Sequence, residues 1–214
     1  MVLNVTGGEF LTGSLDVISQ SLTIPVLVIL LVIVVITIIS LGGIISEYTS
    51  RRKVPVGTIR DLIYEINSAE SQEKLKSVIS SANIPKAQKK VLTEIASSEN
   101  LGDSSREALA RKLFEHEEEK TESALQKTDI ITRIGPTLGL MGTLIPMGPG
   151  LAALGAGDIN TLANSLTVAF NTTIVGIGSG ALCYVIGKIR SGWYDRYLSD
   201  LDALIDAVLD YMGK

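Results

Sequence analysis

The 214-residue sequence has few aromatic residues, 5% of the total, and only one cysteine and one histidine. Cys183 cannot form a disulfide within the chain, and we expect it to pack inside a helix as a small apolar residue. The net charge of −4 comes without a basic patch interleaved with aromatic residues. The sequence therefore predicts no nucleic-acid partner.

Charge is missing from three long stretches. No charged residue occurs in the 30 residues between Asp16 and Glu47, the 24 between Arg133 and Asp158, or the 29 between Asp158 and Lys188. A helix needs about 20 mostly apolar residues to cross a bilayer, so each stretch is long enough. The predicted membrane-spanning helices are residues 24–46, 134–155 and 161–187.

The first stretch differs from a cleavable signal peptide, which has a basic start, a short apolar core and a small-residue cleavage site. Glu9 and Asp16 precede this stretch, and no Lys or Arg does. Its apolar core, residues 24–45, is followed by no A-x-A-like site. We expect it to stay in the membrane as a Val- and Ile-rich, lipid-facing anchor.

The basic residues fall in two places, 15 within residues 47–133 and four after the third span. Basic residues near membrane ends favour the cytoplasmic side, which places the N-terminus outside and the C-terminus inside the cytoplasmic (inner) membrane. The residues that set this orientation are Arg51, Arg52, Lys53, Lys127, Arg133, Lys188 and Arg190. The remaining predicted segments are an external N-terminal segment (1–23), a cytoplasmic helical domain (47–133), an external loop (156–160) and a cytoplasmic C-terminal amphipathic helix (188–214).

Turn and capping signals divide the predicted cytoplasmic domain. Short helices are expected over 58–69, 72–82 and 85–98, and a surface helix over 11–19 precedes the first span. The run from Ser104 to Glu107 has capping-box spacing, and no helix breaker follows until Gly135 and Pro136. We therefore expect one helix to run from near residue 104 into the second span. The predicted fold is all-α, with three spans and long pore helices that extend into the cytoplasm.

His116 lies among five glutamates, which raises the alternative of a metal site. The glutamates are Glu115, Glu117, Glu118, Glu119 and Glu122. Successive residues do not share a helix face, so the pattern favours a solvated charged face. No metal site, catalytic residue or cofactor is predicted.

The last segment is amphipathic. Trp193, Tyr194 and Tyr197 lie where an aromatic belt is expected after the third span. Leu201, Leu204 and Val208 then recur at helical spacing, with aspartates between them. We expect this helix to pack within the assembly.

Spans two and three are rich in small residues. Gly135, Gly139, Gly142 and Pro146 form one helical stripe, and span three contains Gly176 and Gly180. Lipid gives helices no hydrophobic reason to associate, so such residues typically allow close helix packing. The alternative for these helices is a surface that faces water.

Polar residues gather in the third span at Asn171, Thr172 and Thr173. A threonine hydroxyl can donate to a carbonyl of its own helix, whereas the Asn171 amide needs partners or water. The cluster therefore indicates a hydrated or protein-lined surface. No Asp, Glu, His, Lys or Arg lies inside any predicted span. If protons cross here, another subunit must supply the relay group.

Two motifs carry a family resemblance. The run GPTLGLMGTL from Gly135 to Leu144 resembles the A-P-x-x-G-L-x-G-T-V segment of the ExbB/TolQ branch of the MotA/TolQ/ExbB proton-channel family. The run NTTIVGI from Asn171 to Ile177 resembles that family's A-T-A-x-G-L segment in the next helix. Topology, segment order and the trailing cytoplasmic helix are similar too.

The resemblance implies a homo-oligomer, a pentamer, around single-span partners of the ExbD/TolR kind. In that family a membrane Asp of the partner carries the proton, and threonines at the positions of Thr143 and Thr173 face it. Pro136 matches the family's helix-bending proline. Ion flow would drive rotation of the partner inside the ring.

The sequence also departs from the family pattern. Pro146 and Pro149 follow the G-T motif, where they are expected to kink the second span or end it early. Asn171 and Thr172 replace small apolar residues, which makes the expected ion pathway of Thr143, Thr173, Thr172 and Asn171 more polar. The predicted ion is H⁺, with Na⁺ left open.

Two functions other than that of an ion-driven motor subunit stay open. One is a non-conducting oligomeric scaffold that organises partners through its cytoplasmic helices. The other is a secondary transporter, which three spans without an internal repeat disfavour. The leading hypothesis is a pore-forming subunit of an ion-driven motor complex, and not an enzyme.

Overall fold

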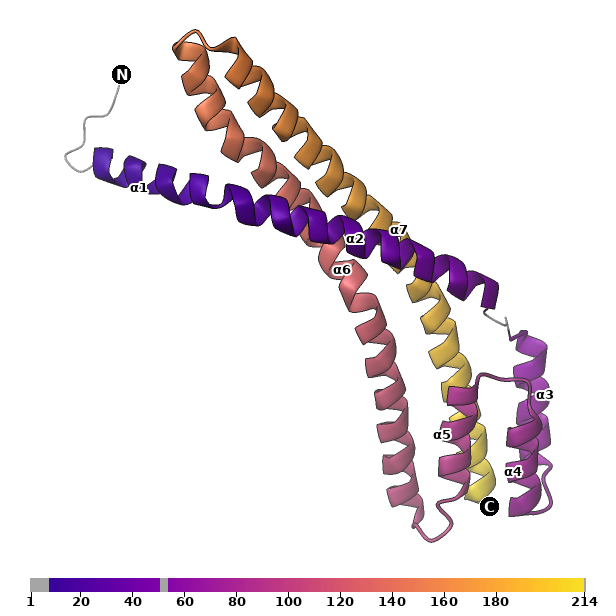
Figure 1. Cartoon of the computed structure of the whole chain (residues 1–214). Coiled ribbons are helices and arrows are strands. Elements are labelled where there is room, and N and C mark those ends of the chain that lie inside the picture. Colours follow the sequence, from indigo (N-terminus) through magenta and orange to yellow (C-terminus); the bar gives the residue numbers. More distant parts are fainter. Residues whose placement is uncertain (1–7, 51–53, 214) are drawn as a thin grey trace. The chain divides into compact units, whose positions relative to one another are not determined.

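A computed structural model describes residues 8–50 and 54–213, and within them every regular element is a helix. The helices are α1 (Gly8–Ser21), α2 (Thr23–Ser50), α3 (Val56–Asn67), α4 (Gln72–Ser81), α5 (Lys86–Ala96), α6 (Asp103–Gly155) and α7 (Ile159–Met212) (Figure 1). Three helical stretches are long and apolar enough to cross a membrane: Phe10–Thr49, Asp103–Gly155 and Ile159–Met212. The predicted all-α, three-span fold with long helices is confirmed.

The chain forms two compact units. The membrane unit contains the described residues up to Glu47 together with Gln126–Lys188, and the hydrophilic unit contains Tyr48–Leu125 and Ile189–Lys214. Helices α6 and α7 each contribute one part to both units. Three of the basic residues on which the predicted membrane orientation rests lie outside the described residues: Arg51, Arg52 and Lys53.

In the membrane unit, α2 packs one stripe of its surface against α6 and α7. Val26, Leu30 and Ile33 of α2 form a buried cluster with Ile131 and Leu138 of α6 and Cys183 of α7. Cys183 is a free, fully buried thiol with its Sγ 3.5 Å from the Thr37 hydroxyl, so its predicted role as a packed residue is confirmed. The other faces of α2 are largely apolar and exposed.

Helix α6 continues past all three of its prolines, Pro136, Pro146 and Pro149, and ends at Gly155. The second span therefore does not end early at Pro146 or Pro149. Each proline removes one backbone donor, but membrane helices tolerate this because neighbouring helices and local adjustments satisfy the freed carbonyl.

A tight turn joins α6 to α7. The Asp158 N–H donates to the Ala153 carbonyl and the Gly157 N–H to the Leu154 carbonyl, at 2.9 and 3.0 Å, which is the Schellman pattern. Gly157 has the positive φ of 81° that this pattern places at its glycine. Because Asp158 then accepts from the Thr161 N–H at 3.0 Å, α7 already begins at Ile159. The regular helix thus takes up part of the predicted loop 156–160.

In the hydrophilic unit, α3, α4 and α5 pack with the first part of α6 and the last part of α7. The buried core contains Ile59, Leu62, Ile66, Leu75, Ile79, Ile84, Val91, Leu92, Ile95, Ala96, Ala110, Leu201, Leu204, Ile205, Ala207 and Val208. The three short helices lie within two residues of their predicted bounds. The Ser71 hydroxyl caps α4 by accepting from the Lys74 N–H, and Pro85 precedes α5.

The start of α6 differs in detail from the prediction. The helix begins at Asp103, and the Gly102 carbonyl accepts from the Ser105 and Arg106 N–H groups. Ser104 is therefore inside the first turn and does not cap the helix. Arg106 is buried, and its guanidinium donates to the carbonyls of Leu101 and Met212, which ties the start of α6 to the end of α7.

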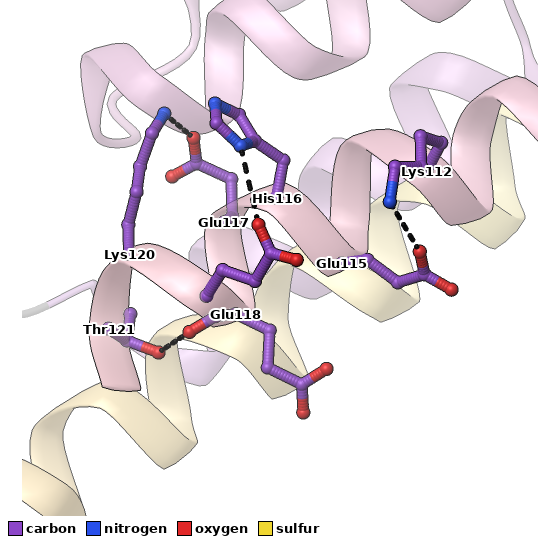
Figure 2. A network of polar contacts seen from close by, with 8 residues as sticks. Lys112, Glu115, His116, Glu117, Glu118, Lys120 and Thr121 are labelled. Atoms are coloured by element: carbon purple, nitrogen blue, oxygen red, sulfur yellow. Dashed lines mark hydrogen bonds and ion pairs between the residues drawn. The ribbon is translucent and has the colours of Figure 1, made fainter. Parts of the chain in front are cut away.

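The glutamate-rich run on α6 forms local ion pairs, shown in Figure 2. Lys112 pairs with Glu115 at 3.1 Å, and His116 lies 3.9 Å from Glu119. No group of residues in the described part of the chain could hold a metal ion. The predicted charged face holds for most of the run, but Glu117 is an exception because it is only 7% exposed.

Glu117 belongs to a network that joins α6, α7 and α5. Its carboxylate accepts from the Tyr197 hydroxyl at 2.8 Å and from Lys120 at 2.6 Å. The Tyr197 carbonyl in turn accepts from the Gln88 amide at 2.9 Å. Tyr197 therefore points into the hydrophilic unit and is not a membrane-belt residue. Trp193, by contrast, lies against the Tyr48 ring, 6.3 Å between centroids.

The network fixes the charge state of both groups. Burial alone would raise the pKa of Glu117, but the hydrogen bonds from Lys120 and Tyr197 outweigh it and hold that pKa below the ordinary 4.5. Burial, and then the neighbouring carboxylate, raise the pKa of the Tyr197 phenol. The pair is thus a carboxylate and a neutral phenol at neutral pH.

We expect Tyr197→Phe to destabilise the protein by about 1–3 kcal/mol at neutral pH, because it removes a donor from a buried carboxylate. A depressed folded-state pKa stabilises the fold above the ordinary value and loses this effect as pH falls through the folded pKa. The deficit of the variant should therefore shrink below about pH 4.5. Thermal unfolding in detergent across pH measures this. Tyr64→Phe, at an exposed tyrosine, is the control, and a deficit that does not depend on pH would contradict the assignment.

Candidate functional site in the second and third spans

Within the membrane unit, α6 and α7 run antiparallel and touch through glycines (Figure 1). A Cβ atom added at Gly176 would lie 2.5 Å from the Gly135 carbonyl oxygen and 2.7 Å from the Gly139 Cα. A Cβ added at Gly135 would lie 2.8 Å from the Gly176 carbonyl oxygen. These neighbours are backbone atoms and cannot rotate away, so only glycine fits at this separation.

The glycine seam, defined as Gly135, Gly139, Gly142, Gly176 and Gly180, continues on both sides of this contact. A Cβ at Gly180 would lie 2.9 Å from Pro136 Cδ, and one at Gly142 would lie 2.6 Å from the Thr172 Cβ. Pro146 is half-buried on the same helix.

The seam is longer than the sequence pattern indicated. A Cβ at Gly150 would lie 2.9 Å from the Ser165 Cβ, although Gly150 falls outside the predicted stripe. In the sequence, Ser165 is one of many small polar residues of the third span. Its contact with Gly150 depends on how α6 and α7 are aligned, which the sequence pattern does not give.

The three threonines of the expected ion pathway all donate to carbonyls of their own helix. The Thr143 hydroxyl donates to Leu140 at 2.6 Å, the Thr173 hydroxyl to Ala169 at 3.0 Å, and the Thr172 hydroxyl to Ala169 at 2.9 Å. Thr172 is only 6% exposed and faces Gly142 across the seam. Thr143 and Thr173 are partly exposed.

Asn171 lies apart from Thr173. Successive residues of an α-helix point about 100° apart, so Asn171 and Thr173 flank the buried Thr172 on opposite sides of α7. Asn171 is exposed, and its amide has no hydrogen-bond partner among the described residues. Thr172 and Thr173 of α7 thus lie against Gly139 and Gly142 of α6, and Asn171 lies on the other flank of α7.

A single carboxylate lies at the turn that joins the two spans. Between Ile134 and Gly187, Asp158 is the only charged residue. Its carboxylate accepts from the hydroxyl and the N–H of Thr161, which lowers the pKa of Asp158. This aspartate acts as the cap of α7, and the spans on either side of it contain no Asp, Glu, His, Lys or Arg.

The fold and the site define a multi-pass helical membrane protein whose last two spans form a closely packed, polar hairpin with no charged residue inside either span. The model of the MotA/TolQ/ExbB proton channel family matches residues 63–203, most of the chain, and the chain belongs to this family. The family is one of proton channels and not of enzymes. No curated protein matches the chain.

We expect Gly176→Ala to destabilise the protein by roughly 1–3 kcal/mol, because the added methyl group meets backbone atoms that can move only if the helices separate. Gly178→Ala is the matched control, since a Cβ there meets open space on the same helix. Thermal unfolding in mild detergent measures both. Equal effects of the two substitutions would show that the seam does not set the helix separation.

Proposed function

We propose that the chain is the pore-forming subunit of an ExbB/TolQ-like motor complex in the cytoplasmic membrane, with its N-terminus outside and its C-terminus inside. It forms a homo-oligomer, a pentamer by resemblance, around a single-span ExbD/TolR-like subunit. Proton flow through this assembly moves the partner. The family match supports the channel role, and the observation that carries the proposal is the polar hairpin whose spans contain no Asp, Glu, His, Lys or Arg.

The hydroxyls of Thr143 and Thr173 support a division of labour between subunits. Each hydroxyl already donates its proton to a carbonyl of its own helix. The exposed lone pairs can then only accept a hydrogen bond. Such a wall suits a donor, and a protonated carboxylic acid is a donor while a carboxylate is not. We infer that Thr143 and Thr173 face the partner's membrane Asp in its protonated form.

Thr172 and Asn171 take other roles in the proposed pathway. Thr172 has a packing role, because its side chain fills the space beside Gly142 between the two helices. The unpaired amide of Asn171 needs partners inside a bilayer, where unmet polar groups cost several kcal/mol. A neighbouring copy in the ring or water in the pore would supply them.

The spans of this chain contain no Asp, Glu, His, Lys or Arg that could relay protons, and this leads to a prediction for transport. In proteoliposomes with an imposed membrane potential, the purified chain alone should pass protons at the background rate. Adding the single-span protein that copurifies with it in mild detergent, with a membrane Asp, should give proton flux. Repeating the flux measurement with a Na⁺ gradient in place of the H⁺ gradient shows which of the two ions crosses. Strong flux from the chain alone would overturn the proposal.

Loss of the acceptor hydroxyls gives a second prediction. Thr143→Val and Thr173→Val should each lower flux by about twofold to tenfold, as expected for the loss of one hydrogen bond, while the assembly survives. Thr167→Val is the matched control, because that exposed hydroxyl also donates to its own helix, at Ala163. A non-conducting scaffold predicts that all three variants retain full function.

A further inference from the structure

The hydrophilic unit carries a hollow lined by lysines on α5. Lys86, Lys89 and Lys90 line this space of about 490 Å³ together with Ser80, Thr93, Glu94 and Ser97. The Lys89 ammonium donates to the Ser80 carbonyl at 2.6 Å. Lys86 and Lys90 are exposed, and neither forms an ion pair with any described residue. The lysine hollow, as we call this site, therefore presents a net positive charge, because its three lysines outnumber Glu94.

The exposed face of α7 in the same unit carries the opposite charge. Asp202, Asp206 and Asp210 recur every four residues, are all exposed, and form no ion pair within the described part of the chain. Burial raises the pKa of Asp206, and so does the repulsion from Asp202 and Asp210. A cationic neighbour would relieve this repulsion.

The two surfaces match in spacing as well as in charge. A helix rises 1.5 Å per residue, so residues four apart on either helix lie about 6 Å apart along its axis. Lys86 and Lys90 have this spacing on α5, and Asp202, Asp206 and Asp210 have it on α7. The charges of two such helices laid side by side meet in register.

We propose that the lysine hollow of one copy of this chain binds the acidic face of α7 from a second copy. The inference rests on the proposed homo-oligomer and names one of its contact surfaces. Exposed ion pairs are individually weak, so this contact supplies only part of the attraction between neighbouring copies, whereas reversing the charge on one side would replace that attraction by repulsion. Because salt screens exposed charges, the contact should weaken as ionic strength rises.

Charge reversal tests the interface on the full-length protein in mild detergent, with oligomeric mass as the readout. K86E/K90E and D202K/D206K should each shift the oligomer to smaller species, by at least tenfold in the protein concentration needed for assembly. The chain that carries all four substitutions should regain the wild-type mass. R111E/K112E, which changes the net charge by as much as K86E/K90E at exposed positions of α6, is the control for that variant.

A cross-link gives the second readout. Two differently tagged chains, one with Lys90→Cys and one with Asp206→Cys, both in a Cys183→Ala background, should form a disulfide between copies when coexpressed and oxidised. Neither variant alone should form that mixed product. The cross-link together with rescue by the fourfold variant supports the interface.

The outcomes also separate this inference from the proposed function. If the wild-type chain is an oligomer but the reversals leave its mass unchanged, or the control disrupts it equally, the interface is wrong and the channel proposal stands. If the wild-type chain is a monomer in membranes, both fail.

Discussion

The Gly135 carbonyl and the Gly176 Cα approach so closely that a methyl group on Gly176 would lie 2.5 Å from that oxygen. This contact sets how far apart α6 and α7 can be, and the rest of the membrane unit follows from it. It leaves room for Thr172 only beside Gly142, and it holds Pro136 against Gly180. It also fixes the two flanks of the hairpin, one with Thr173 and one with Asn171. The hydroxyls of the proposed pathway can keep their positions beside a moving partner only if the distance between α6 and α7 is fixed. Backbone contacts fix this distance, because they do not change when side chains change rotamer.

The same two helices change their packing chemistry along their length. In the membrane unit they meet through glycine and threonine, because lipid gives no hydrophobic gain and close contact must supply the attraction. In the hydrophilic unit they contribute large apolar residues such as Leu201 and Leu204, whose burial from water is itself favourable. A hydrogen-bond network around the buried Glu117, with Tyr197 and the more exposed Lys120, fixes the relative positions of α6 and α7 in that packing. Each of the two helices thus packs through close contact of small residues in the membrane unit and through burial of apolar side chains in the hydrophilic unit.

Much of this was readable in the sequence, and the exceptions have physical causes. Charge-free stretches and turn signals predicted the spans and the short helices α3, α4 and α5, because these depend on local composition. The prediction for Ser104 was wrong because Gly102 can start the helix two residues earlier, without a side-chain cap. Nothing local singled out Glu117 among five glutamates. Its burial depends on a contact with Tyr197, which is 80 residues away in the sequence.

The hydroxyls of the proposed pathway are more specific than their polarity implies. A threonine free to rotate can donate or accept, so it would stabilise a carboxylate as well as a carboxylic acid. Thr143 and Thr173 donate to helix carbonyls, so their remaining lone pairs can only accept. Beside such a wall, the proposed partner's acid gains a hydrogen bond when protonated and meets only lone pairs when ionised. The wall would then favour the protonated form of that acid where it faces the threonines. Release would require the acid to leave them, and in this way a hairpin with no charged residue inside its spans could couple proton transfer to movement of the proposed partner.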